Sequence, residues 1–167
     1  MSDGMKMRVF LASAFARDTD LLVLDEPGSS LDPLMRDRLC GRFRDYIDSG
    51  NGERRINFST HNIADMENAA DYVIFMDNGK VIEQGFTEDL KDKYIALSAE
   101  PESLDKISPL LLCSSHSSST ATGLALAENK LKLEALGAVT ERPTLSQLSI
   151  DLMKIAEEKR LALKKEA

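Results

Sequence analysis

The chain has 167 residues, of which 43% are hydrophobic, so it can form one modest core with a small appendage and is not expected to be disordered. Its net charge of -7 and the lack of a long basic run argue against a nucleic-acid-binding surface, so we expect no nucleic-acid partner. No apolar segment approaches the ~20 residues that a membrane-spanning helix needs, and Cys40 and Cys113 stand in no metal-ligand spacing, which is typical of thiols in a reducing compartment.

The N-terminus can be interpreted either as a signal peptide or as an amphipathic helix. Lys6 and Arg8 precede an apolar stretch over residues 9–16, which imitates a signal peptide. Asp3 interrupts the basic start, however, and the stretch is at the short limit for such a peptide. We therefore predict a helix and a cytoplasmic location.

Ser2 is predicted to cap this first helix, because a serine hydroxyl can accept a hydrogen bond from a free amide of the first turn. Asp3 adds a negative charge where the helix dipole favours one. Phe10 and Ala14 are expected on the buried face of the helix.

The next segment combines an apolar run with two adjacent acids. Residues 21–24 are apolar without alternation, which predicts a strand buried on both faces, as in parallel sheets. Asp25 and Glu26 follow at the carboxyl end, where open α/β sheets bind ligands. Two neighbouring carboxylates are costly to bury without a positive charge, so they indicate Mg²⁺ with a phosphate behind it. Alternatively, the run is a core strand that leaves the sheet through a polar turn.

A second helix and a second strand come next. Asp32 and Pro33 form a helix start, with a capping residue followed by a proline at the first helical position. Residues 49–52 are predicted to form a loop, and residues 56–60 a short strand that ends at His61. The predicted core stripe of the helix repeats every four residues and consists of Met35, Leu39, Phe43 and Ile47.

A short amphipathic helix over residues 63–70 precedes a predicted β-hairpin. Asn78 and Gly79 lie between the apolar runs 72–77 and 80–83, and an Asn-Gly pair in this position is a strong hairpin signal. The hairpin is expected to end near Gly85.

The remaining residues predict a smaller α+β region. Residues 101–112 suggest a helix disturbed by Pro109, and the Ser/Thr-rich residues 113–122 suggest a loop with His116 on its surface. Residues 124–136 fit either a strand or a helix. A long helix is predicted from Pro143 onward, and we favour packing of its apolar stripe on its own domain over partner binding; the stripe consists of Leu145, Leu148, Leu152 and Ile155.

Four of these features together resemble the C-terminal part of an ABC-type ATPase. Residues 1–5 resemble its signature motif, residues 21–26 its Walker B motif with the catalytic glutamate, residues 30–32 its D-loop, and His61 its switch histidine. The resemblance is close over residues 1–85 and looser over residues 86–167, which resemble the C-terminal extension of exporter-type ATP-binding subunits. It implies an α/β fold: the C-terminal part of a P-loop NTPase domain with parallel core strands and the hairpin, in residues 1–85, followed by the extension.

The resemblance also implies ATP and Mg²⁺ as cofactors. Asp25 would position Mg²⁺ through a water, Glu26 would polarise the attacking water, and His61 would contact the γ-phosphate. Four further residues would act at the interface with a second ATP-binding subunit, two toward its ATP and two between the two sites: Ser2, Gly4, Ser30 and Asp32. A transmembrane permease subunit would hold the chain at the inner face of the cell membrane.

Three residues depart from the family pattern, and one motif is missing. Asp3 and Met5 replace the usual Gly and Gln of the signature, and Gly28 replaces the usual Thr or Ser. The phosphate-binding loop Gly-x-x-x-x-Gly-Lys-Ser/Thr does not occur in these 167 residues. We therefore expect a partial domain that binds nucleotide weakly alone and has apolar surface and a sheet edge exposed.

Three functions remain open at this stage. The first is the ATP-binding subunit of an ABC transporter, in particular an exporter. The second is a non-catalytic half-domain that lends its signature motif to, or pairs with, a separate ATPase chain. The third is a chromosome-maintenance or repair ATPase, which the residues after Pro27 disfavour because they follow the transporter type.

Overall fold

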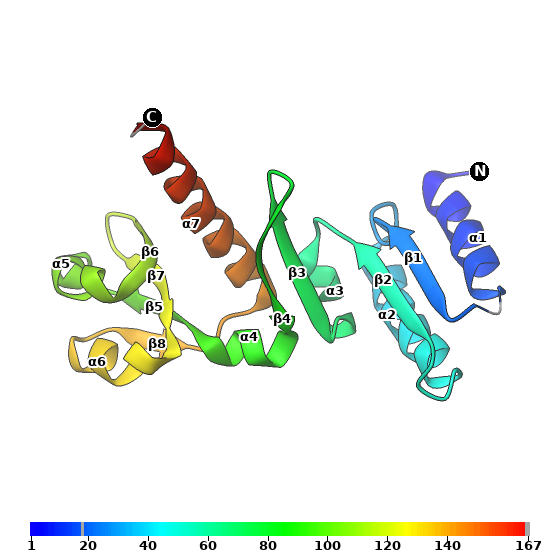
Figure 1. Cartoon of the computed structure of the whole chain (residues 1–167), viewed down its shortest axis with the longest axis horizontal. Coiled ribbons are helices and arrows are strands. Elements are labelled where there is room, and N and C mark those ends of the chain that lie inside the picture. Colours follow the sequence, from blue (N-terminus) through cyan, green and yellow to red (C-terminus); the bar gives the residue numbers. More distant parts are fainter. Residues whose placement is uncertain (18, 166–167) are drawn as a thin grey trace. The chain divides into compact units, whose positions relative to one another are not determined.

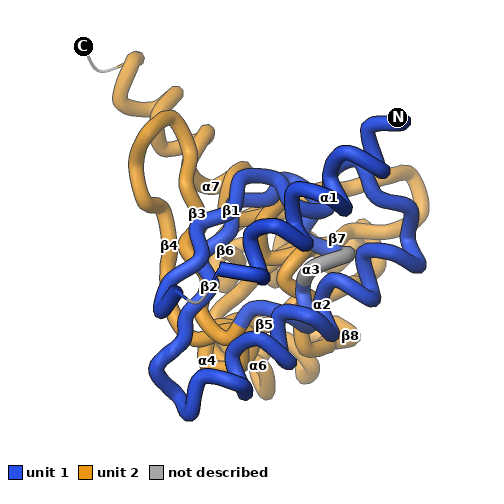
Figure 2. The backbone as a smooth tube through the Cα atoms, turned by 90° about the vertical axis from the view of Figure 1, so that its right-hand side faces the viewer, with its two compact units in different colours: residues 1–70 blue, residues 71–167 orange. Residues whose placement is uncertain are grey.

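The computed structural model describes residues 1–17 and 19–165 (Figure 1). It divides into two compact units, residues 1–70 and residues 71–167 (Figure 2). These compact units separate between Ala70 and Asp71. The boundary expected after Gly85 is that of the ATPase domain, which is a different division of the chain, and it stays a prediction. None of the described helices has the length and hydrophobicity of a membrane span.

Unit 1 is built around two parallel strands. It contains, in chain order, α1 (Asp3–Phe15), β1 (Leu21–Asp25), α2 (Pro33–Asp48), β2 (Arg55–Ser59), α3 (Ile63–Met66) and the 3-10 helix η1 (Glu67–Ala69). Strand β1 pairs with β2 in parallel, from Leu21 opposite Arg55 to Asp25 opposite Ser59. The core joins α1, α2 and one face of this sheet through Leu11, Leu24, Leu31, Leu39, Cys40 and Phe43.

The prediction that β1 is buried on both faces is wrong. Leu22 and Leu24 are buried, whereas Leu21 and Val23 remain 55% and 70% exposed. Successive side chains of a strand point to opposite faces, and the core of unit 1 lies on the face that carries Leu24. On the other face β1 exposes the apolar side chains of Leu21 and Val23, whereas β2 exposes the polar Arg55, Asn57 and Ser59.

The first helix has the predicted cap but a different buried face. The hydroxyl of Ser2 accepts a hydrogen bond from the amide of Met5 at 3.3 Å, which confirms the N-cap. Phe10 is 54% exposed, so its predicted burial is wrong, while Leu11 is buried and Ala14 packs against the core. Neighbouring residues of a helix point about 100° apart, so the burial of Leu11 turns Phe10 outward.

Unit 2 begins with the predicted hairpin and continues into a four-stranded antiparallel sheet. Strands β3 (Tyr72–Asp77) and β4 (Lys80–Phe86) are antiparallel, and the turn between them places Asn78 and Gly79 at φ +47° and +73°. The sheet has the strand order β6-β7-β5-β8, with β5 (Tyr94–Ala99), β6 (Leu111–His116), β7 (Ala121–Leu126) and β8 (Val139–Glu141). The helices are α4 (Thr87–Lys93), α5 (Leu104–Ile107), α6 (Lys130–Ala135) and α7 (Leu145–Lys165), with the 3-10 helices η2 (Pro101–Ser103), η3 (Ser108–Leu110) and η4 (Ala127–Asn129).

One prediction for unit 2 is wrong and another is only partly right. Most of residues 113–122 belong to the strands β6 and β7, and only the turn between these strands is irregular, so the predicted loop is wrong. The predicted helix over residues 101–112, disturbed by Pro109, is confirmed over residues 101–110 as the consecutive segments η2, α5 and η3, and only its last two residues belong to β6 instead. His116 is exposed as expected.

Residues 124–136, which fit either a strand or a helix, contain both. Strand β7 extends to Leu126, and residues 130–135 then form α6. Gly137, at φ +89°, ends that helix in the left-handed conformation that suits glycine. The final helix α7 forms as predicted, and Leu145, Leu148 and Leu152 are buried within unit 2.

A cluster of polar groups around Glu83 fixes the hairpin to the rest of unit 2. Oε2 of Glu83 lies 2.5 Å from Nζ of Lys93 and accepts the hydroxyl of Tyr94, and Oε1 accepts the amide of Gln84 at 3.0 Å. Burial by itself would raise the pKa of Glu83, but the hydrogen bonds from Lys93, Tyr94 and the amide together outweigh it, so this pKa lies below its ordinary value. The ionised carboxylate therefore stabilises the folded state.

Replacing Glu83 with Gln should lower the free energy of unfolding of unit 2 at pH 7 by about 1–2 kcal/mol, because charge-assisted hydrogen bonds from Lys93 and Tyr94 are lost. A carboxyl whose folded pKa is depressed contributes stability above its unfolded pKa and loses it as the pH falls through the folded pKa. The difference between wild type and variant should therefore shrink below pH 4.5, the ordinary value. Urea unfolding between pH 2 and 7 measures it, with the exposed Glu102→Gln as control; a difference independent of pH would contradict the role of the charge.

Candidate functional site

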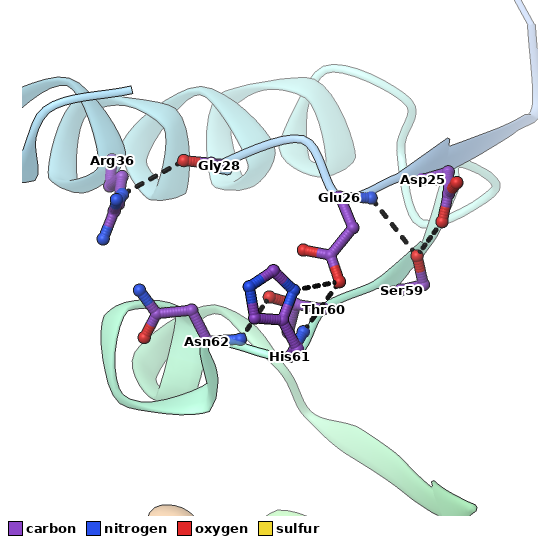
Figure 3. A network of polar contacts seen from close by, with 8 residues as sticks. All are labelled: Asp25, Glu26, Gly28, Arg36, Ser59, Thr60, His61 and Asn62. Atoms are coloured by element: carbon purple, nitrogen blue, oxygen red, sulfur yellow. Dashed lines mark hydrogen bonds and ion pairs between the residues drawn. The ribbon is translucent and has the colours of Figure 1, made fainter. Parts of the chain in front are cut away.

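The parallel pairing of β1 and β2 brings the predicted acids and histidine together. Strands in parallel end at the same edge of a sheet, and here Asp25 lies opposite Ser59 at that edge. Glu26 comes directly after β1, and His61 comes two residues after the end of β2. Figure 3 shows these side chains gathered at the ends of the two strands.

Glu26 and His61 form a direct pair. The backbone amide of His61 donates to Oε1 of Glu26 at 2.8 Å, and Nδ1 of the His61 ring lies 2.6 Å from the same oxygen (Figure 3). The Glu26 side chain is 30% exposed and that of His61 is 79% exposed, so both groups can meet a ligand from solvent. The pair therefore fixes Oε1 of Glu26 beside His61, at a place that a ligand can reach from solvent.

Glu26 has an unusual backbone conformation. Its φ is +47°, in the left-handed region that non-glycine residues adopt only when the surroundings hold them there. Its amide donates to both the carbonyl oxygen and the hydroxyl of Ser59, each at 3.2 Å. The hydroxyl of Ser59 in turn donates to Oδ1 of Asp25. The sharp turn after β1 thus directs two consecutive acids to one place.

The segment after Glu26 forms a compact turn into α2. Nε of Arg36 donates to the carbonyl oxygen of Gly28 at 3.0 Å (Figure 3). Asp32 caps α2 by accepting the amide of Met35 at 3.0 Å, as predicted, and Leu31 is buried in the core. This anchors the residues that resemble the D-loop.

A second group of predicted residues meets at the start of α1. A Cβ atom built on Gly4 would lie 2.9 Å from the carbonyl oxygen of Ser30, so these two backbones are in close contact. Asp3, which departs from the family pattern, forms an exposed ion pair with Lys6, with Oδ1 2.9 Å from Nζ. The structure thus brings Gly4 of the predicted signature next to Ser30, and it brings Asp25, Glu26 and His61 together at the ends of β1 and β2.

Replacing Gly4 with Ala should destabilise unit 1 by about 1–2 kcal/mol, because the new methyl group would meet the backbone oxygen of Ser30. The matched control is Gly41→Ala in α2, where nothing lies within 4 Å. That substitution should stabilise the helix by about 0.5–1 kcal/mol. Thermal unfolding of both variants measures the two effects, and a shift in the same direction for both would contradict the close approach at Gly4.

The sequence prediction missed Ser59. It names the acids and the histidine but not the serine that bonds to both acids. The strand register could have indicated this residue. If β1 ends at Asp25 and the parallel strand β2 ends shortly before His61, one side chain at the end of β2 must lie beside Asp25.

The donors fit part of a magnesium and phosphate site. Mg²⁺ is usually held by one or two carboxylates, waters and substrate phosphates, and Asp25 and Glu26 supply two carboxylates within reach of solvent. Among the described residues, no group of three or more His, Cys, Asp or Glu side chains could hold a metal ion alone. The site therefore suits a metal ion that arrives with a phosphate ligand better than an isolated metal.

Comparison with known proteins agrees with this chemistry. Residues 1–66 match the family model described as "AAA domain, putative AbiEii toxin, Type IV TA system". Nod factor export ATP-binding protein I of Cupriavidus pinatubonensis is 35% identical over 95 residues, which are 57% of this chain and 28% of that protein. The oligopeptide transport ATP-binding protein OppD of Mycoplasma genitalium is 33% identical over 118 residues, 65% of this chain and 28% of that protein.

A third relative has a different named substrate. The glycine betaine transport ATP-binding protein OpuAA of Bacillus subtilis is 32% identical over 111 residues, 64% of this chain and 26% of that protein. The chain thus spans little more than a quarter of the length of these curated relatives. The chain is thus similar to part of several ABC transporter ATP-binding proteins, and its mixed α/β fold is consistent with part of a P-loop NTPase domain.

Proposed function

We propose that the chain is part of an ATP-binding subunit of an ABC transporter, in which ATP hydrolysis is coupled to substrate transport. The observation that carries this proposal is the contact between Glu26 and His61 beside Asp25, at the carboxyl ends of two parallel strands. The names of the relatives support transport over chromosome maintenance, because all three are transport proteins.

In the proposed reaction the two acids have different tasks. Asp25 would hold Mg²⁺ through a water, and the ion would neutralise charge on the phosphates. Glu26 acts as the general base, because its Oε1 is held by the amide and ring of His61 while its other oxygen can accept a hydrogen bond from the attacking water. His61 is exposed enough to contact the γ-phosphate from the same side.

The start of α1 is proposed to act on the nucleotide of a second subunit. The free amides and the dipole of a helix N-terminus attract anions, and Ser2 and Gly4 lie in that first turn. The close approach of Gly4 to Ser30 links this turn to the D-loop region that Asp32 anchors. ATP bound between two subunits would thereby be contacted by residues of both subunits.

A permease subunit and an exporting direction complete the proposal. The ATP-binding relatives are named for export or transport, and transport needs a membrane subunit. The exporting direction is inferred from the looser resemblance of residues 86–167 to the extensions of exporter subunits. The relatives include a protein named for export and proteins named only for transport, so the direction rests on that extension. The chain would lie at the cytoplasmic face of the membrane through the permease.

The alternative proposal is a non-catalytic half-domain. The observation that favours it is the lack of the Gly-x-x-x-x-Gly-Lys-Ser/Thr loop in these 167 residues, because that loop supplies the amides and lysine that hold phosphate. In this case a separate chain provides the loop, and α1 contributes its N-terminus to that chain's nucleotide.

One purification from native cells tests both proposals. The protein is isolated with its bound chains, its intact mass is measured, and ATP hydrolysis is compared between wild type and Glu26→Gln. Hydrolysis that needs Mg²⁺ and is lost in the variant supports the ATPase. Hydrolysis that is present but indifferent to Glu26, with a mass near 18.5 kDa, supports the half-domain. The absence of hydrolysis in every preparation would overturn the first proposal.

A further inference from the structure

Ser59 lies where a single hydroxyl can reach both acids of the site. Burial alternates along β2, so Ser59 lies on the exposed face of the sheet, the same face as Asp25. The parallel register sets the two residues directly opposite each other. Side chains in this relation stand next to one another, which explains why the hydroxyl of Ser59 donates to Oδ1 of Asp25.

The same hydroxyl also constrains Glu26. The amide of Glu26 donates to Oγ and to the carbonyl oxygen of Ser59, each at 3.2 Å. These bonds hold the first residue after β1 at φ +47°, a conformation that a glutamate does not favour by itself. In this conformation the Glu26 carboxylate accepts the amide of His61 at 2.8 Å.

We propose that Ser59 is a positioning residue that fixes Asp25 and Glu26 relative to each other through its hydroxyl. The expected effect of Ser59 on catalysis rests on the proposed ATPase function. Its expected effect on the conformation of Asp25 and Glu26 does not. The task needs one group that donates to a carboxylate and accepts an amide at the same time, which a hydroxyl can do. Threonine keeps that group, whereas alanine removes it and valine keeps only the shape of threonine.

The geometric test is amide hydrogen exchange at Glu26, followed by NMR on the full chain without nucleotide. Exchange should become about tenfold faster in Ser59→Ala and Ser59→Val, and Ser59→Thr should restore most of the protection. Ser13→Ala, which removes an exposed hydroxyl from α1, is the matched control and should leave Glu26 unchanged. Unchanged exchange in Ser59→Ala, or equal acceleration in all three Ser59 variants, would overturn the proposal.

The catalytic test uses the protein purified with its native partner chains. Ser59→Ala should lower kcat for ATP about tenfold with little change in KM, and Ser59→Thr should recover most of the loss. Glu26→Gln is measured beside it to separate the two hypotheses. If Glu26→Gln is inactive while Ser59→Ala equals wild type, the positioning role is wrong and the ATPase stands. If Glu26→Gln retains full activity, the proposed function itself fails, and the exchange experiment alone decides on Ser59.

Discussion

Replacing Glu26 with Gln is expected to lower ATP turnover by the assembled protein at least ~100-fold, which is the lower range of what a general base contributes. The amide of glutamine cannot take a proton from the attacking water. Its single carbonyl oxygen can still accept the amide of His61, which now bonds to Oε1 at 2.8 Å, so the turn after β1 should persist. ATP-dependent association with a second subunit should therefore remain while hydrolysis is lost.

Steady-state phosphate release measures turnover in this variant, and sedimentation with and without ATP measures association. The matched control is Glu53→Gln, an exposed glutamate in the loop between α2 and β2 of the same unit, which should behave like wild type. Turnover at the wild-type rate in Glu26→Gln would remove Glu26 from the mechanism. Loss of both turnover and association would instead indicate that the substitution disturbs the fold.

The parts of the fold that depend on short-range chemistry could be predicted from the sequence. The caps at Ser2 and Asp32 need only a side-chain oxygen and a free amide three residues later, and both form as expected. The turn at Asn78 and Gly79 needs only two residues that accept positive φ, and both have it. These features are decided within a few residues, so tertiary packing did not override them.

The parts that depend on neighbours were predicted less well. Strand β6 contains Ser114, Ser115 and His116, which are exposed, and it lies at the edge of its sheet. A polar edge strand has the composition of a loop, and only its pairing with β7 makes it a strand. The prediction that β1 is buried on both faces was wrong because an apolar composition does not show how many faces of a strand other elements cover.

The candidate site, too, has a part that the sequence predicts and a part that depends on how neighbouring strands pair. The convergence of Asp25, Glu26 and His61 follows from two strands that end at one edge, which the sequence pattern indicates. The bonds from Ser59 and the left-handed Glu26 follow from the register of those strands and could not be obtained from residue types. The sequence pattern thus indicates which candidate groups meet, while the pairing of the strands determines how they are held.

Replacing Phe43 with Ala should destabilise unit 1 by about 3–5 kcal/mol, the usual cost of deleting a buried aromatic ring. Phe43 is 2% exposed, and its ring lies 6.1 Å from that of Phe15 and 5.3 Å from that of Phe58, so its loss leaves a cavity shared by α1, α2 and β2. The control is Phe10→Ala, which removes the same ring from a largely exposed position and should cost no more than about 0.5 kcal/mol. Native-state hydrogen exchange of the α2 amides measures both changes within unit 1. Equal losses in the two variants would mean that the ring of Phe10 packs inward in solution, and the assignment of the buried face of α1 to Leu11 would then be wrong.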